Sequence, residues 1–241
     1  NDFIGNDEFG ILIGENVSGI LHGNTIKNNN GDGVIIQGKA GSIDFRYNNI
    51  YENGIYQLES KRTDPIVDAQ YCWWGDDSNP GDKIQGEVNY ENWLEVPSTL
   101  KCEGQLSWSK ISPGQTVKGS FTVTNIGDNQ SRLDWRIAEY PDWGTWSFEP
   151  QSQGDLTPEK GLTTVQVTVT APDEQKQDFT GKVKVVNSDD SSNYDTIQFS
   201  LSTPKNKGIQ TIFIQFLKNI VQNHPNLFPL IRLLQNQSTT L

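Results

Sequence analysis

The sequence has no methionine, only two cysteines and two histidines, and no apolar run of the roughly 18 residues that a membrane-spanning helix needs. Two thiols are too few for a zinc site built from thiolates, and the two histidines lie far apart in the chain. No charged segment followed by an apolar one opens the sequence. Because the first residue is Asn1 and methionine is absent, we expect a mature product or a fragment that has lost any upstream signal peptide.

Basic residues are also scarce, since 19 lysines and arginines stand against 30 aspartates and glutamates and give a net charge of −11. A chain this acidic repels the phosphate backbone, which argues against nucleic acid as a partner. The plain alternative reading is an acidic, well-hydrated surface. With 241 residues and 34% hydrophobic content, two domains with slender cores fit better than one large domain.

An internal repeat occupies the first part of the chain. Phe3, Ile26 and Ile50 follow one another at 23 and 24 residues, and Gly10 and Gly33 are 23 residues apart. Isoleucine and valine of such a repeat point into a narrow core, while asparagine and glycine occupy the corners. A stacked asparagine amide can also bond the same residue one coil away. The period predicts a parallel β-helix over residues 1–96.

At these residues the chain resembles the right-handed β-helix repeats of the NosD-like, carbohydrate-associated repeat superfamily. The resemblance implies a right-handed coil and extends to the closing segment, in which Cys72 replaces the usual asparagine and Asn79 precedes a proline where glycine is usual. That closing segment comprises Cys72-Trp73-Trp74-Gly75, Asn79-Pro80-Gly81, Ile84-Gln85-Gly86-Glu87-Val88-Asn89-Tyr90 and Trp93-Leu94.

The aromatic residues of the closing segment have two readings. They plug the open end of the solenoid, because no further coil buries it, or they stack on a sugar. The first reading is favoured. The residues concerned are Trp73, Trp74, Tyr90 and Trp93.

A linker is expected over residues 97–104, and strict alternation of apolar and polar residues begins at Gln105. Six or seven alternating segments predict an immunoglobulin-like β-sandwich over 105–204, with Trp135 in its core. The segments 124–128, 133–135, 141–143 and 156–158 resemble the BACON-like group of immunoglobulin-like domains. That resemblance implies a spacer in a glycan-directed surface protein. Three aromatic residues form an exposed sugar platform or, the favoured alternative, pack into the sandwich: Tyr140, Trp143 and Trp146.

The two cysteines, Cys72 and Cys102, stand near the boundary between the two expected domains. A disulfide between them would tie the end of the β-helix to the linker. The alternative is a pair of small buried thiols.

The last 37 residues, 205–241, differ from the rest because they hold four basic residues and no acidic one. Their charge of +4 leaves −15 on the body of the chain. Apolar residues at helical spacing predict two short amphipathic helices that dock on the sandwich, on a partner subunit or on a membrane surface. This tail resembles the C-terminal tails of some archaeal surface proteins. Its two apolar stripes are Ile209, Ile212, Phe213, Phe216, Leu217, Ile220 and Val221, then Leu227, Leu230, Ile231 and Leu234.

No catalytic set is evident. His22 and the pair Asp76 and Asp77 are fragments of the motifs that polygalacturonase-like β-helix enzymes carry, without a basic partner set. Asp76, Asp77 and Asp82 are weak candidates for calcium, against the favoured reading of a solvated acidic loop. No cofactor is expected. The N-glycosylation sequons begin at Asn16, Asn129 and Asn236.

These features together predict an all-β, non-catalytic, extracellular or cell-surface protein: a short right-handed parallel β-helix, an immunoglobulin-like β-sandwich and an amphipathic α-helical tail. Its expected function is structural or adhesive, as a subunit of a larger extracellular assembly, with partners among copies of itself, other surface proteins or glycans. The alternative is the C-terminal remnant of a secreted polysaccharide-active enzyme, or a carbohydrate-binding protein.

Overall fold

A computed structural model describes residues 1–38, 41–204 and 216. All but one residue of the expected helical tail, 205–241, therefore lies outside the described residues. The described chain is all-β, apart from two short 3₁₀ turns, η1 (Pro80–Lys83) and η2 (Pro158–Lys160). Within this part of the chain no helix has the length and apolar character that crossing a bilayer takes.

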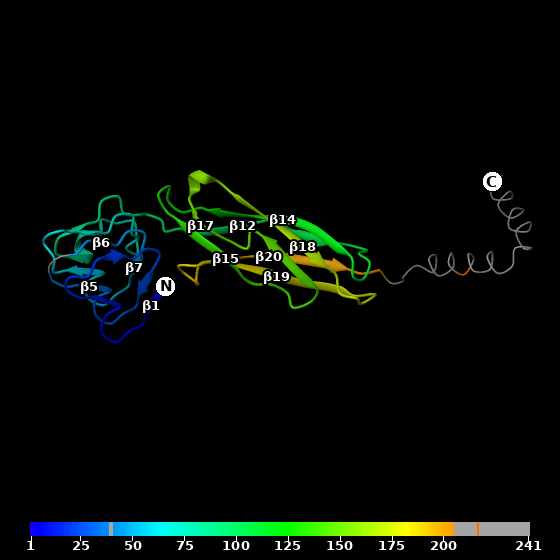
Figure 1. The fold of residues 1–241 in the computed structure, drawn as a ribbon, viewed down its shortest axis with the longest axis horizontal. Helices are drawn as coiled ribbons and strands as arrows, with labels where there is room; N and C mark the ends of the chain where they lie inside the picture. Colours follow the sequence, from blue (N-terminus) through cyan, green and yellow to red (C-terminus); the bar gives the residue numbers. More distant parts are fainter. Residues whose placement is uncertain (39–40, 205–215, 217–241) are drawn as a thin grey trace, which may run out of the picture.

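Residues 1–96 form a β-solenoid of about four turns, which confirms the architecture that the repeat predicts. The strands are short because each coil bends after two or three residues, and they stack in parallel on the strands one coil away (Figure 1). Ile26 pairs with Phe3 on one side and with Ile50 on the other, so the sequence period is the pairing register. The first sheet has the order β1 (Asp2–Ile4), β4 (Thr25–Lys27), β7 (Asn49–Tyr51). The second sheet has the order β10 (Ile84–Gln85), β8 (Leu58–Ser60), β5 (Val34–Ile36), β2 (Ile11–Ile13). The third sheet has the order β11 (Val88–Asn89), β9 (Val67–Asp68), β6 (Ile43–Asp44), β3 (Gly19–Ile20).

The solenoid interior is a column of mostly aliphatic side chains closed at one end by tryptophan and tyrosine. Trp74 is 1% exposed, Tyr90 and Trp93 pack partly buried against the same core, and Trp73 is partly buried beside the Tyr51 ring. This packing favours the plug over sugar stacking for the closing segment. The fully or nearly fully buried column consists of Ile26, Val34, Ile36, Ile43, Phe45, Ile50, Leu58, Val67 and Ala69.

Two rows of amide side chains run beside this column. In the first row Asn24 Nδ2 donates to Asn48 Oδ1 at 2.9 Å, and Asn48 Nδ2 donates to the main-chain oxygens of Leu21 and Phe45 at 2.7 and 2.6 Å. In the second row Asn29 Nδ2 donates to Asn53 Oδ1 at 2.8 Å. These buried amides satisfy corner backbone groups that no strand partner reaches.

The solenoid also buries one arginine, Arg62, which is 1% exposed. Its guanidinium donates to main-chain carbonyls on the two preceding coils, among them Val17 at 3.2 Å and Gln37 and Gly14 at 3.4 Å. A buried cation needs such partners, because desolvation without them is costly. Arg62 therefore ties together the turns at one corner of the solenoid.

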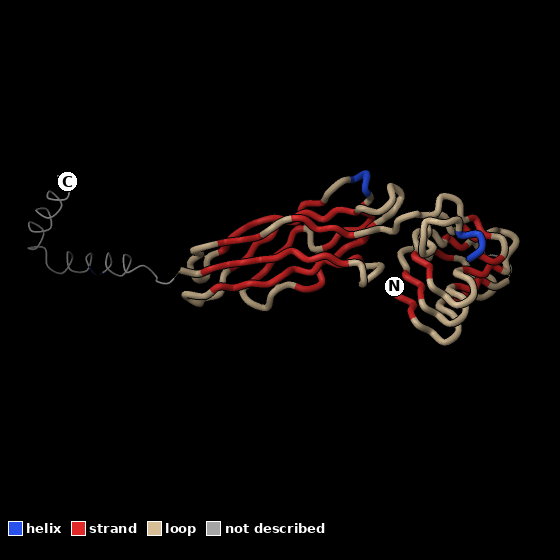
Figure 2. The backbone as a smooth tube through the Cα atoms, turned by 180° about the vertical axis from the view of Figure 1, so that it is seen from behind, coloured by secondary structure: helices blue, strands red, loops and turns tan. Residues whose placement is uncertain are grey.

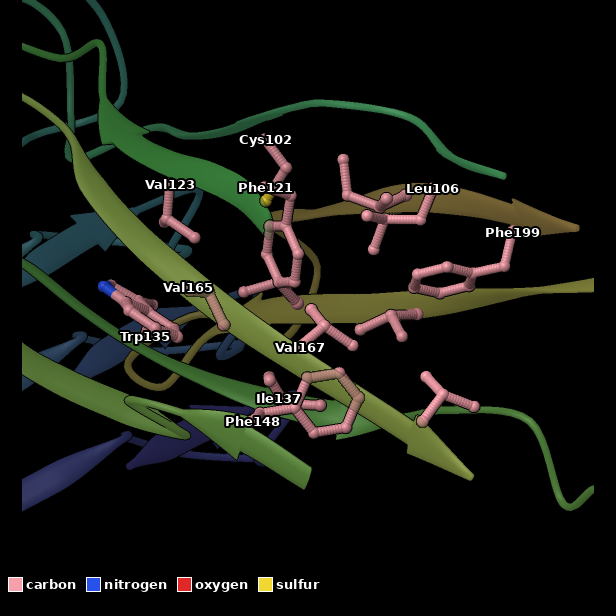
Figure 3. Close-up of a cluster of buried hydrophobic side chains, with 14 of the residues drawn as sticks. Cys102, Leu106, Phe121, Val123, Trp135, Ile137, Phe148, Val165, Val167 and Phe199 are labelled. Atoms are coloured by element: carbon pink, nitrogen blue, oxygen red, sulfur yellow. The ribbon is translucent and has the colours of Figure 1, made fainter. Parts of the chain in front are cut away.

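The second domain is a β-sandwich whose two sheets enclose one apolar core (Figures 1 and 2). Trp135, 1% exposed, lies within it among side chains from both sheets, as expected (Figure 3). One sheet has the order β12 (Leu100–Glu103), β14 (Thr116–Asn125), β18 (Thr163–Thr170), β16 (Thr145–Glu149); the other β13 (Leu106–Trp108), β20 (Tyr194–Ser202), β19 (Asp178–Asn187), β15 (Leu133–Glu139), β17 (Ser152–Leu156).

The expected linker over 97–104 is corrected by this topology, because β12 lies inside it and pairs with β14. Leu100 and Cys102 point into the sandwich core, while Lys101 and Glu103 are exposed. The four residues alternate like any half-buried strand. A run of four was too short to stand out from a linker in the sequence.

Candidate functional site at the junction of the two domains

The aromatic platform expected from Tyr140, Trp143 and Trp146 is only partly exposed. Both tryptophans pack against the sandwich core, and their indole nitrogens are engaged: Trp143 Nε1 donates to Thr180 O at 3.1 Å and Trp146 Nε1 to Trp143 O at 2.7 Å. Tyr140 is 50% exposed. This arrangement fits the expected packing role and leaves one ring on the surface.

The acidic loop with Asp76, Asp77 and Asp82 does not gather into a cation site. Lys83 Nζ lies 2.7 Å from Asp76 Oδ2, and this hydrogen bond holds the pKa of the Asp76 carboxyl below its ordinary value. Among residues 1–38 and 41–204, no group of three or more aspartate, glutamate, histidine or cysteine side chains is placed to hold a metal ion.

The expected disulfide is wrong, because Cys72 and Cys102 are both free and belong to two separate cores. Cys72 Sγ donates to Phe45 O at 3.1 Å in the solenoid, and Cys102 packs among the apolar side chains of the sandwich (Figure 3). Burial raises the pKa of each thiol to about 12. The pair are thus the small buried thiols of the alternative reading.

The remaining expected residues are distributed over the surface. Asn16 and Asn129, the first residues of two sequons, are exposed, whereas Asn236 lies outside the described residues. Of the docking tail, only Phe216 is described, and it is 57% exposed.

In the structure His22 lies in a cluster of charged side chains that the sequence did not reveal. Its Nε2 lies 2.7 Å from Asp44 Oδ1, and Arg46 Nε donates to the same oxygen at 2.7 Å. Asp68, paired with Asp44 across β6 and β9, lies 3.8 Å from Arg46. The hydrogen bond from Arg46 is the main reason that the pKa of Asp44 falls well below its ordinary value.

Beside this cluster, one corner of the solenoid turns through the left-handed backbone region in three successive coils. Gly23, Tyr47 and Tyr71 occupy it with φ of 62°, 59° and 57°. Glycine adopts this conformation freely, but for a bulky residue it costs free energy, of the order of 1 kcal/mol or more.

The rings of Tyr47 and Tyr71 stack, with centroids 5.2 Å apart and planes 11° from parallel. The guanidinium of Arg132, which comes from the sandwich, lies 4.1 Å from the centre of the Tyr47 ring. Arg132 is also paired with Asp155 Oδ1 at 3.2 Å. A guanidinium over an aromatic face is attracted by the ring quadrupole, so this stack joins the two domains.

A second contact between the domains comes from the hairpin loop between β19 and β20. Thr25 Oγ1 in the solenoid donates to Asp189 O in this loop at 2.6 Å. A third contact is made by the connecting segment, where the amides of Glu95 and Val96 donate to Asp128 Oδ2 at 2.6 and 3.0 Å. The junction is therefore held at three separate places.

Between these contacts lies a cavity of about 110 Å³. This volume is well below the roughly 300–1,000 Å³ of typical small-molecule sites. Among its lining side chains the Arg132 guanidinium crosses to the Tyr47 ring, whereas His22 bonds Asp44 within the solenoid. Asp189 contributes a carboxyl whose pKa is raised to about 6, mainly by burial. The lining residues are His22, Gly23, Tyr47, Arg132, Asp134, Asp155 and Asp189.

No family model matches the chain, and no curated protein matches it. The PapD-like domain 7 of human CEP192 is 15% identical with a TM-score of 0.35, over 46% of this chain and 89% of that one. A GH5 xyloglucanase from Bacteroides ovatus is 16% identical with a TM-score of 0.31, over 44% of this chain and 19% of that one. Domains 4 and 5 of the S-layer protein SbsC are 13% identical with a TM-score of 0.28, over 52% and 62%.

Similarities of this size carry no functional argument. The solved structures that resemble the chain include PapD-like domains, and each of these three alignments covers about half of it.

Proposed function

We propose that this chain is a non-catalytic structural or adhesive module of an extracellular or cell surface, built from a NosD-like β-helix and a BACON-like sandwich. The observation that carries the proposal is the junction, where stacking and hydrogen bonds fix one domain against the other. A spacer that bears load or presents a partner surface needs a fixed angle between its parts. The Arg132 guanidinium and the main-chain oxygen of Asp189 are both engaged in this contact.

Rigid coupling is tested by backbone NMR relaxation of the chain. We expect the solenoid and the sandwich to report one common rotational correlation time. Arg132→Ala removes the guanidinium from Tyr47 and should shorten the correlation time of each domain. Arg136→Ala is the matched control, because Arg136 is exposed on β15 and forms no ion pair among the described residues. Two independent correlation times in the unmodified protein would refute the proposed role.

The surface role itself is tested by imaging and mass measurement of native particles, where we expect the chain within a larger assembly. The tail, 205–241, is proposed as the docking or anchoring segment. Removal of residues after Pro204 should lower the particle mass or the retention at the cell surface, and unchanged mass and retention would contradict this role for the tail.

A second candidate function follows from the cluster of His22, Asp44, Arg46 and Asp68 on one side of the solenoid. Carboxylates with arginine and histidine on successive coils are groups that bind sugar hydroxyls or act as acid and base. Incubation with a panel of polysaccharides separates the two functions. Cleavage or retention that Asp44→Asn abolishes would favour the glycan-directed one.

A further inference from the structure

The hairpin loop between β19 and β20 presses one carboxyl group against the solenoid. In Figure 1 this loop reaches the solenoid beside β1 and the N-terminus. Its backbone is fixed on both sides: Ser188 N donates to Asp134 O at 2.6 Å, and Asp189 O accepts from Thr25 Oγ1 at 2.6 Å. The side chain of Asp189 is therefore held at the contact between the domains.

The Asp189 carboxyl lies directly on the solenoid backbone. A methyl group placed on Gly23 would come within 2.7 Å of Asp189 Oδ2. Within the described part of the chain no donor reaches either carboxylate oxygen of Asp189. An ionised carboxylate in this position has lost water on one side and gained no hydrogen bond in exchange, which is unfavourable.

The charged groups around Asp189 make its ionised form less favourable still. Asp134 on β15 and Asp2 on β1 both raise the pKa of Asp189 by repulsion, and the amine of Asn1 acts in the opposite direction. The guanidinium of Arg132, which also lines the cavity, is paired with Asp155. The titratable or charged groups that face Asp189 from both domains are Asn1 (amine), Asp2, His22, Tyr47, Arg132, Asp134 and Asp155, with Asp190 next to it in the loop.

We propose that the junction is a pH-sensitive contact: protonated Asp189 closes the loop onto the solenoid, and ionised Asp189 loosens it. Burial raises the pKa of this carboxyl from 3.8 to about 6. Because the pKa is raised in the folded state, the stabilisation is fully present below about pH 4 and is lost as the pH rises through about 6. The pH response depends on the junction geometry alone, whichever function the module has.

Two measurements on the whole chain test the proposal. The first follows the side-chain carboxyl carbon of Asp189 by NMR between about pH 3 and pH 8, and we expect a midpoint near pH 6. The second follows amide hydrogen exchange of residues 22–27 and 188–193, corrected for the intrinsic effect of pH on exchange. We expect local opening to be at least about threefold more frequent at pH 7.5 than at pH 5.

Asp189→Asn keeps the shape of the side chain and removes its titration, so exchange in both segments should become independent of pH at the protected level. Asp173→Asn is the control, because Asp173 is an exposed aspartate that does not line the cavity. It should leave the pH response unchanged. A midpoint below about pH 4.5 in the unmodified protein, or equal protection at both pH values, would overturn the proposal without bearing on the rigid coupling measured by relaxation.

Discussion

Asn48→Ala tests how far the buried amide rows hold the solenoid together. The side chain of Asn48 is 0% exposed and takes part in at least four short contacts. Its Oδ1 accepts from the main-chain and side-chain nitrogens of Asn24, both at 2.9 Å. Its Nδ2 donates to the carbonyls of Leu21 and Phe45. Alanine makes none of these bonds and leaves a void where the amide was.

The magnitude follows from the groups that are left behind. A buried polar group without a partner costs about 1–3 kcal/mol, and Asn48→Ala strands two donors on Asn24 in addition to carbonyls of the preceding coil. Partial relaxation and entry of water reduce the sum, so we expect a loss of about 3–5 kcal/mol in the free energy of unfolding of the solenoid. Small domains have about 5–15 kcal/mol in total, so this loss is a large fraction.

Urea unfolding followed segment by segment with hydrogen exchange is the appropriate assay, because a chain of two domains need not unfold in one step. Asn30→Ala is the matched control: Asn30 is an exposed asparagine of the solenoid, and its side chain forms no hydrogen bond among the described residues. Its effect should stay within about 0.5 kcal/mol. If Asn48→Ala also cost less than about 1 kcal/mol, the amide rows would not be what stabilises the stacking of coils.

Three further predictions concern the described residues. Cys72 and Cys102, with pKa values near 12, should resist iodoacetamide at about pH 8 in the folded protein. Both should react in denaturant without a reductant. If they reacted in denaturant only after a reductant was added, the two cysteines would form a disulfide. Arg62→Met should lower the free energy of unfolding by about 1–3 kcal/mol and speed amide exchange at residues 14–17. Lys61→Met is the control, because Lys61 is exposed. Unchanged exchange at residues 14–17 in Arg62→Met would contradict the role of Arg62. Gly54→Ala should cost about 1–3 kcal/mol in urea unfolding, because the new Cβ would lie 2.1 Å from Asn30 O; a neutral effect would show that the coil yields easily.

The solenoid was predictable because its register repeats the period of the sequence. Phe3, Ile26 and Ile50 are spaced along the chain as they are stacked in the core, so a local pattern encodes a contact between coils. The sandwich was predictable for a related reason, since alternation marks which side of each strand is buried. The short strand β12 is the exception, because its four residues give little pattern and resemble a linker in the sequence.

The junction could not be predicted, because its contacts join residues with no shared pattern. Thr25 and Asp189 are 164 positions apart, and nothing in either neighbourhood refers to the other. One signal was available: Gly23, Tyr47 and Tyr71 stand at equal spacing of 24 residues. Tyrosine in the place of glycine at a corner could have marked the surface where Arg132 stacks.

The disulfide was predicted wrongly for a reason that the fold makes clear. Cys72 follows Asn48 by 24 residues and continues the same row, where Asn48 N lies 3.5 Å from its sulfur. It occupies an interior position of the solenoid. Count and spacing of cysteines carry no information about which of two cores each thiol enters.

The direction of the hydrogen bonds in the amide rows bears on how a β-solenoid of this kind can change its length. Where a row continues, the asparagine of one coil donates to the asparagine of the next coil along the chain, as Asn1 does to Asn24, Asn24 to Asn48 and Asn29 to Asn53. Duplication or loss of one whole repeat of 23 or 24 residues preserves every such bond, whereas insertion of a single residue breaks them all locally. Genetic variation should therefore be tolerated in whole repeats, each of which lengthens or shortens the solenoid by about 4.8 Å.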